Sequence, residues 1–164
     1  MFRTTTETRA LVADPSVHMA ELVAGMLRSL KIRLVDVTHN PGDTQRALAS
    51  RSYQLMLVDA GLCSDQEFTH LRDLRQSERH PNRHLPIIMM AAAPSAALIA
   101  AARDAGVTEF LRKPFSAQHI QLRLNAIQAS PRPFVSAEGY TGPDRRRRVI
   151  AGAPSRRAAD DGRR

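Results

Sequence analysis

Residues 53–59 read YQLMLVD, and their last five residues form an apolar run that closes on Asp59. A strand that is buried on both faces of a parallel sheet has this kind of continuous apolar sequence, so we predict an interior parallel strand over residues 55–59. Residues 9–14, RALVAD, have the same form and close on Asp14. The sequence therefore predicts two buried strands, each with a carboxylate at its end.

The remaining apolar runs and helical stripes alternate along the chain. Apolar runs predict further strands at residues 32–37, 86–90 and 107–111. A first helix is predicted by an apolar stripe, which consists of Met19, Leu22, Val23, Met26, Leu27 and Leu30. Four further helices are predicted over residues 44–52, after a turn at Asn40-Pro41-Gly42, and over residues 65–78, 95–105 and 116–129. Five strands that alternate with five helices predict an α/β domain of the flavodoxin-like class, with a doubly wound five-stranded parallel sheet. Such a fold binds ligands outside the carboxyl ends of its strands, where Asp14, Asp59 and Lys113 are expected.

The basic charge of the chain lies mostly at its C-terminal end. From Pro131 onward there are nine arginines and four acidic residues, a net charge of +5 out of the total of +8. We therefore divide the 164 residues into an N-terminal arm (1–8), a domain (9–130) and an arginine-rich ligand-binding tail (131–164). The last 25 residues contain eight arginines and, apart from alanine, only Val149 and Ile150 as aliphatic side chains. We expect this segment to be disordered until an anionic partner orders it.

Composition also excludes several classes of function. No apolar stretch approaches the roughly 18 residues that span a bilayer, and the N-terminus has no signal-peptide hydrophobic region, so we expect a cytoplasmic protein without membrane insertion. The single cysteine, Cys63, excludes an internal disulfide, and the six histidines are too scattered to predict a metal site. The sequence shows no nucleophile–base arrangement and no phosphate-binding glycine loop, so we do not expect an enzyme.

The placement of the charged residues resembles the receiver domain of two-component response regulators, the fold of the chemotaxis protein CheY, over about residues 8–128. In that family an aspartate at the position of Asp59 accepts a phosphoryl group, and an invariant lysine, followed by a proline that is usually cis, stands at Lys113. Asp14 matches the first member of the acidic pair that holds Mg²⁺. Phe110 matches the aromatic switch position. The resemblance thus implies a receiver pocket formed by Asp14, Asp59, Ala91, Phe110 and Lys113.

Two positions depart from the family pattern. Pro15 replaces the second acid of the pair, and Ala91 stands where a serine or threonine normally hydrogen-bonds the phosphoryl group. Because Mg²⁺ prefers octahedral oxygen ligands, the loss of one carboxylate weakens a metal site built on Asp14 and Asp59. We therefore expect these two residues and Lys113 to persist as a structural ion-pair cluster, and we rank this role above that of Asp59 as a phosphoacceptor.

The arginines of the tail suit a guanine nucleotide. Guanine presents O6 and N7 as adjacent acceptors, and an arginine guanidinium can donate two hydrogen bonds to them. The N–H groups on the other edge of guanine can donate to a carboxylate. The planar guanidinium can also stack on the base. Cyclic di-GMP carries two guanines and two phosphates, and so offers all of these contacts. Arg157 and Asp160 have the RxxD spacing that recurs in cyclic di-GMP sites, although Arg33 and Asp36 match it equally well inside a predicted strand.

The stretch YTGPDRRRR at residues 140–148 resembles the arginine-rich extension of a small family of CheY-like proteins, the Cle proteins of alphaproteobacteria. In that family the extension binds cyclic di-GMP and the receiver then engages the flagellar motor switch, which implies a role in motility and surface attachment and recruitment to the flagellar base at the cell pole. We interpret Tyr140 as a ligand contact, because the tail has little else to bury. The resemblance implies a cyclic di-GMP site formed by Tyr140, Gly142, Pro143, Asp144, Arg145, Arg146, Arg147 and Arg148, with Arg156, Arg157 and Asp160 as a second arm.

Three other interpretations remain open. One is a single-domain response regulator that a histidine kinase phosphorylates, with an incidental basic tail. Another is a nucleic-acid-binding adaptor, which predicts a steep salt dependence and little preference for guanine, because phosphate contacts dominate nonspecific binding. Specific DNA recognition is not expected in either case. The third is a solvated tail that binds polyanions without specificity.

Overall fold

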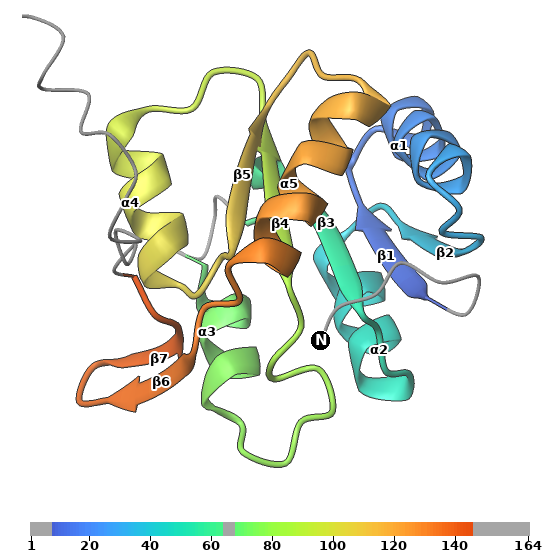
Figure 1. Cartoon of the computed structure of the whole chain (residues 1–164). Helices are drawn as coiled ribbons and strands as arrows, with labels where there is room; N and C mark the ends of the chain where they lie inside the picture. The colour runs from blue at the N-terminus through green and yellow to red at the C-terminus, as the bar shows by residue number, and fades with distance from the viewer. Residues whose placement is uncertain (1–7, 64–67, 146–164) are drawn as a thin grey trace, which may run out of the picture.

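The computed structural model describes residues 8–63 and 68–145, so the N-terminal arm lies outside the described residues apart from Thr8 (Figure 1). Five parallel strands form one sheet in the order β2-β1-β3-β4-β5. The strands are β1 (Arg9–Ala13), β2 (Leu34–Thr38), β3 (Leu55–Asp59), β4 (Ile87–Ala91) and β5 (Glu109–Arg112). This order is that of the flavodoxin-like doubly wound fold, so the predicted fold class is confirmed.

Helices cover both faces of the sheet (Figure 1). Those on one face are α1 (Val17–Ser29) and α5 (Ala117–Ala129), whose Val23, Leu27 and Ile120 pack in one core cluster with Val12 and Leu57 of the strands. Those on the other face are α2 (Pro41–Ser50), α3 (Thr69–Gln76) and α4 (Ala96–Asp104), and a 3-10 turn, η1 (Ala60–Leu62), follows β3. Because both faces of the central strands are covered, their sequences read as unbroken apolar runs.

Polar side chains fix where α1 and α2 begin. The Ser16 hydroxyl accepts a hydrogen bond from the Met19 N–H at 3.3 Å, and Asn40 Oδ1 accepts one from the Asp43 N–H at 2.9 Å. Asn40 thus caps α2, and Pro41 takes the first helical position, where a missing N–H costs nothing. The predicted helix over residues 44–52 therefore starts too late, because Asn-Pro-Gly can begin a helix as well as form a turn. The predicted helix over residues 65–78 is α3, and its first predicted residues, 65–67, lie outside the described residues.

A β-hairpin follows α5 and packs on the domain (Figure 1). Its antiparallel strands are β6 (Phe134–Ala137) and β7 (Tyr140–Pro143). The Tyr140 ring is 7% exposed, and its hydroxyl donates to the Pro143 carbonyl oxygen at 2.6 Å. The prediction that residues 140–164 are disordered is therefore wrong for 140–145, because the domain supplies the surface on which Tyr140 is buried. The rest of that segment, 146–164, lies outside the described residues.

Two glycines allow the hairpin to contact the domain backbone. A Cβ atom at Gly142 would lie 3.0 Å from Gly106 Cα and 2.7 Å from the Tyr140 hydroxyl. Gly106 has a φ of +88°, and a Cβ atom there would lie 2.8 Å from Arg75 Cγ. Glycine at both positions is therefore required for β7 to lie directly against the turn that precedes β5.

Arg75 holds this region together from inside. Its side chain is fully buried, and its guanidinium donates to the carbonyl oxygens of Arg83 at 2.6 Å, Leu85 at 2.7 Å and Gly106 at 2.8 Å. Burial lowers the pKa of Arg75 to about 10, so the group is still charged at neutral pH and its N–H groups need acceptors. The three carbonyl oxygens are those acceptors, and they join α3 to the segments that lead into β4 and β5.

We expect Arg75→Ala to lower the free energy of unfolding by at least about 2 kcal/mol, because it leaves three buried carbonyl oxygens without this donor and opens a cavity. Urea unfolding followed by circular dichroism measures the change. Arg79→Ala is the matched control, since Arg79 is exposed in the turn after α3 and should change stability by no more than about 0.5 kcal/mol. Equal losses in the two variants would contradict the role assigned to Arg75.

Candidate functional site

Three charged side chains from different strands meet at the carboxyl edge of the sheet. Asp14 follows β1, Asp59 ends β3 and Lys113 follows β5. Lys113 Nζ lies 2.7 Å from Asp14 Oδ2 and 2.6 Å from Asp59 Oδ2. The structure thus brings together the residues that the sequence places in one ion-pair cluster.

The second oxygen of each carboxylate is also occupied. Asp14 Oδ1 accepts a hydrogen bond from the Ser16 N–H at 2.9 Å, and Asp59 Oδ1 accepts one from the Gly61 N–H at 2.8 Å. The Asp14 side chain is 2% exposed and that of Asp59 is 15% exposed. Carboxylates with so little contact with water need such partners, and here both have them.

The charge of Lys113 is stabilised by the two carboxylates. Burial by itself would lower the pKa of Lys113, but the hydrogen bonds to Asp14 and Asp59 and their negative charges outweigh burial and raise the pKa above its ordinary value. Because the folded state binds this proton more tightly than the unfolded chain does, the stabilisation is complete at neutral pH. It is lost only as the pH rises through the raised pKa.

These residues do not fit Mg²⁺, the metal that the family resemblance implies. Mg²⁺ prefers octahedral oxygen ligands, but the Lys113 ammonium already contacts both carboxylates. Pro15, at the position of the second acid, is exposed and has no side-chain oxygen. Within residues 8–63 and 68–145, no group of three or more His, Cys, Asp or Glu side chains could hold a metal ion. The cluster is therefore an ion-pair site rather than a good metal site.

The other two residues of the predicted receiver pocket belong to one hydrophobic cluster. Ala91 ends β4, is 7% exposed, and accepts a hydrogen bond at its carbonyl oxygen from the Lys113 N–H at 2.8 Å. Phe110 lies on β5 and packs, partly buried, against the same cluster. Because a methyl group has no hydrogen-bond donor, the Ala91 side chain cannot hydrogen-bond a phosphoryl group.

The predicted tail site is only partly within the described residues. Tyr140 and Gly142 are buried and Pro143 and Asp144 are partly buried, whereas Arg145 is exposed. The ring of Tyr140 therefore faces the domain, which differs from its predicted role as a ligand contact, because the hairpin gives it a surface to pack on. Arg146, Arg147, Arg148, Arg156, Arg157 and Asp160 lie outside the described residues.

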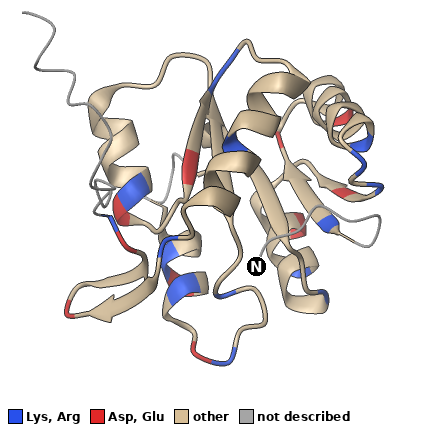
Figure 2. Cartoon of the chain, in the orientation of Figure 1, with Lys and Arg blue, Asp and Glu red and all other residues tan. Residues whose placement is uncertain are grey.

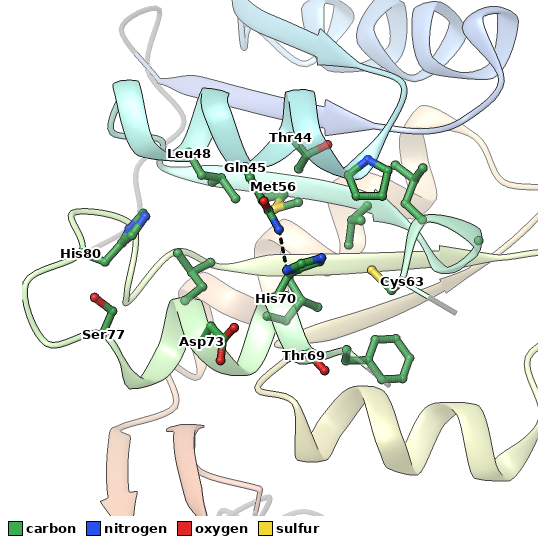
Figure 3. Close-up of a pocket in the computed structure, with 17 residues that line it drawn as sticks. Thr44, Gln45, Leu48, Met56, Cys63, Thr69, His70, Asp73, Ser77 and His80 are labelled. Atoms are coloured by element: carbon green, nitrogen blue, oxygen red, sulfur yellow. Dashed lines mark hydrogen bonds between the residues drawn. The ribbon is translucent and has the colours of Figure 1, made fainter. Parts of the chain in front are cut away.

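A groove of about 790 Å³ lies between α2 and α3, and no sequence motif indicated it (Figure 3). Its lining is mainly apolar, and a hydrogen bond between Gln45 and His70 joins the two helices across it. Cys63 lines it too, and burial, with a smaller effect of the Asp59 charge, raises the pKa of this thiol to about 12. No arginine or lysine is among the described residues that line the groove, so it is poorly suited to an anionic nucleotide.

Comparison with known families agrees with this geometry. The sequence profile of the response regulator receiver domain matches residues 10–125. The chain belongs to the response regulator receiver family. It is thus a receiver domain of two-component signalling. Among the residues that the structure describes, no helix combines the length and apolar character needed to cross a bilayer.

Three curated relatives share this domain. The chemotaxis protein CheY of Pseudomonas aeruginosa is 25% identical over 119 residues, which cover 73% of this chain and 94% of CheY. The response regulator PmrA of the same organism is 26% identical over 73% of this chain and 52% of PmrA. The transcriptional regulatory protein KdpE of Escherichia coli is 32% identical over 57% of this chain and 42% of KdpE. The chain therefore spans about half the length of the last two relatives.

Solved structures show the same fold. The chemotaxis response regulator CheY4 of Vibrio cholerae superposes with a TM-score of 0.64 at 17% identity, over 73% of this chain and 98% of CheY4. The receiver domain of the sensor histidine kinase PA1611 of Pseudomonas aeruginosa, which was solved with a magnesium ion in its active-site cleft, gives a TM-score of 0.62 at 23% identity, over 75% of this chain and 99% of that domain. At these identities the likeness establishes the fold alone.

We expect Lys113→Met to lower the free energy of unfolding by about 3–5 kcal/mol at pH 7, because it leaves Asp14 as a buried charge without its cation. Adding Asp14→Asn removes that charge and should recover at least half of the loss. Urea unfolding of both variants measures the effect, with Lys31→Met, at the other and exposed lysine, as the control. If Asp14→Asn recovers nothing, the loss does not come from the unpaired carboxylate.

Proposed function

We propose that this receiver domain is a cyclic di-GMP effector. Nucleotide bound by its arginine-rich tail promotes docking of the receiver on the flagellar motor switch, and so controls motility and surface attachment. The observation that carries the proposal is the position of Arg145, where the arginine run begins. Its guanidinium carbon lies 4.1 Å from the centre of the Tyr140 ring, and its Nη1 lies 2.7 Å from Asp104 Oδ1 at the end of α4. The arginine run therefore starts from a defined point beside α4.

The receiver site supports an input other than phosphate. Lys113 already pairs with both Asp14 and Asp59, the donor set does not suit Mg²⁺, and Ala91 has no hydroxyl to bind a phosphoryl group. Receiver domains are signalling domains rather than enzymes in general, and we assign this chain no catalysis. A receiver that transmits a signal without phosphotransfer needs a ligand in place of the phosphoryl group. The arginine-rich tail is the part of the chain with the chemistry to bind one.

The tail supplies the contacts that a guanine dinucleotide requires. The run Arg145 to Arg148 and the second arm of Arg156 and Arg157 can each grip phosphates and guanine edges with bidentate hydrogen bonds, and Asp160 can accept from the opposite guanine edge. In this proposal the buried Tyr140 positions the run through its contact with Arg145, together with Gly142, Pro143 and Asp144 of the hairpin. The tail ligand is cyclic di-GMP and not a specific DNA sequence.

The proposed partner surface lies beside the start of the tail. The family resemblance puts motor docking on the face formed by α4, β5 and α5, and Arg145 contacts Asp104 in α4. Nucleotide bound near Arg145 therefore changes the charge next to this face. We place the active protein in the cytoplasm, with recruitment to the flagellar base when the nucleotide is bound.

A phosphorylation-dependent response regulator is the second candidate. The observation that favours it is the position of Asp59, which ends β3 with 15% of its side chain exposed, where the family carries its phosphoacceptor. A histidine kinase would then be the partner, and the tail would be incidental. Labelling of Asp59 by a small phosphodonor with Mg²⁺ would favour this candidate over the first.

We expect the double substitution Arg147→Ala/Arg148→Ala to weaken cyclic di-GMP binding by more than about 1 kcal/mol per lost bidentate contact. Lysine at the same two positions should restore little affinity, because lysine keeps the charge but lacks the planar fork. Calorimetric titration of the full chain at fixed salt measures both variants. Full recovery with lysine, or equal affinity for a single-stranded RNA, would instead indicate nonspecific polyanion binding.

Docking on the motor switch should depend on the nucleotide and not on Asp59. We expect wild type and Asp59→Asn to co-purify with a flagellar motor switch protein to the same extent when cyclic di-GMP is present, and neither to do so without it. By linkage, the motor protein should raise nucleotide affinity by the factor by which the nucleotide raises motor affinity. Loss of docking in Asp59→Asn with nucleotide present would contradict this proposal and favour the phosphorylation-dependent response regulator.

A further inference from the structure

A second cavity, of about 440 Å³, lies between α4, β5 and α5 and reaches the start of the tail. Four of its nine lining residues are arginines from four separate parts of the chain, and the others are mostly apolar. In Figure 2 the acidic segment of β5 lies between a basic segment of α4 and a basic segment of α5. The lining residues are Ile99, Arg103, Val107, Thr108, Glu109, Phe110, Arg123, Arg132 and Arg145.

The cavity has more positive than negative charge. Arg132 pairs with Glu109 at 3.1 Å, and Asp104 is shared by Arg145 at 2.7 Å and by Arg103 at 3.8 Å. Arg123 forms no ion pair with any other described residue. Four guanidinium groups thus meet two carboxylates, which leaves an excess of positive charge for an anion to balance. Arginine forks bind phosphate oxygens in pairs, so a phosphate ester is the chemical class that this charge suits.

The rest of the lining suits the uncharged part of a nucleotide. Phe110, Ile99 and Val107 provide apolar surface, and Ile99 is 42% exposed although its side chain is large and apolar. A cavity of 440 Å³ lies in the range that binds small organic ligands. Aromatic and guanidinium groups both stack on base faces. The combination of an apolar wall and free guanidinium charge therefore fits a base together with its phosphate.

We infer that this cavity is the receiver's own half of the nucleotide site. It holds one phosphate and base of the dinucleotide, while the tail binds the other half. Arg145 belongs to both halves, because it lines the cavity and begins the arginine run. This inference rests on the proposed function and assigns Arg103 and Arg123, which sequence reasoning did not select, to ligand binding.

The assignment also links the nucleotide to the docking face. A ligand in the cavity contacts side chains of α4, β5 and α5 at once, including Phe110 at the switch position. It can therefore hold these three elements in one arrangement, since a ligand stabilises the state that it binds best.

The test is calorimetric titration of the full chain with cyclic di-GMP at one salt concentration. We expect Arg103→Ala/Arg123→Ala to weaken binding at least tenfold. The control, Arg46→Ala/Arg79→Ala, removes the same charge from two exposed arginines that do not line the cavity, and should weaken binding no more than threefold. Thermal unfolding without ligand checks that both variants are folded.

The outcomes separate this inference from the proposed function. Tenfold weakening in the cavity variant alone supports the inference. Wild-type binding with equal effects of the two double substitutions overturns the inference and leaves the tail as the whole site. No binding by wild type overturns the proposed function and the inference together.

Discussion

Lys113 places one positive charge between two carboxylates that belong to different strands, and the carboxyl edge of the sheet depends on this contact. Without the ammonium, Asp14 and Asp59 would meet as like charges where water has little access. Because β1, β3 and β5 run parallel, all three residues reach the same edge. The same contact occupies one oxygen of each carboxylate that a metal would need.

A different set of contacts organises the opposite edge. Arg75 donates to carbonyl oxygens that precede β4 and β5, and Gly106, one of these acceptors, lies against Gly142 of the hairpin. The tail therefore begins at the amino edge of the sheet, whereas the carboxylate cluster lies at the carboxyl edge. β5 connects the two edges and carries Phe110 between them. In the proposed mechanism the nucleotide acts on β5 from the end opposite to the one that a phosphoryl group would use.

The sequence predicted the parts of the molecule whose signals are local. Apolar runs closing on Asp14 and Asp59 identified the strands, and the geometry of parallel strands then brought those residues and Lys113 together. The hairpin was missed because its strands are short and the surface that buries Tyr140 belongs to the distant turn at Gly106. The arginine-lined cavity was missed for a related reason. Its arginines lie far apart in sequence, and only the folded chain gathers them.

The contact between Gly106 and Gly142 offers a way to recognise related proteins. A close contact between two backbones restricts both positions to glycine, because any side chain there would clash. A glycine in the turn before β5, a second glycine in a Tyr-x-Gly-Pro segment after α5, and an arginine in α3 that binds the turn form a pattern set by backbone contact. Receivers that share this triplet should anchor their tails at the same place, whatever ligand those tails have come to bind.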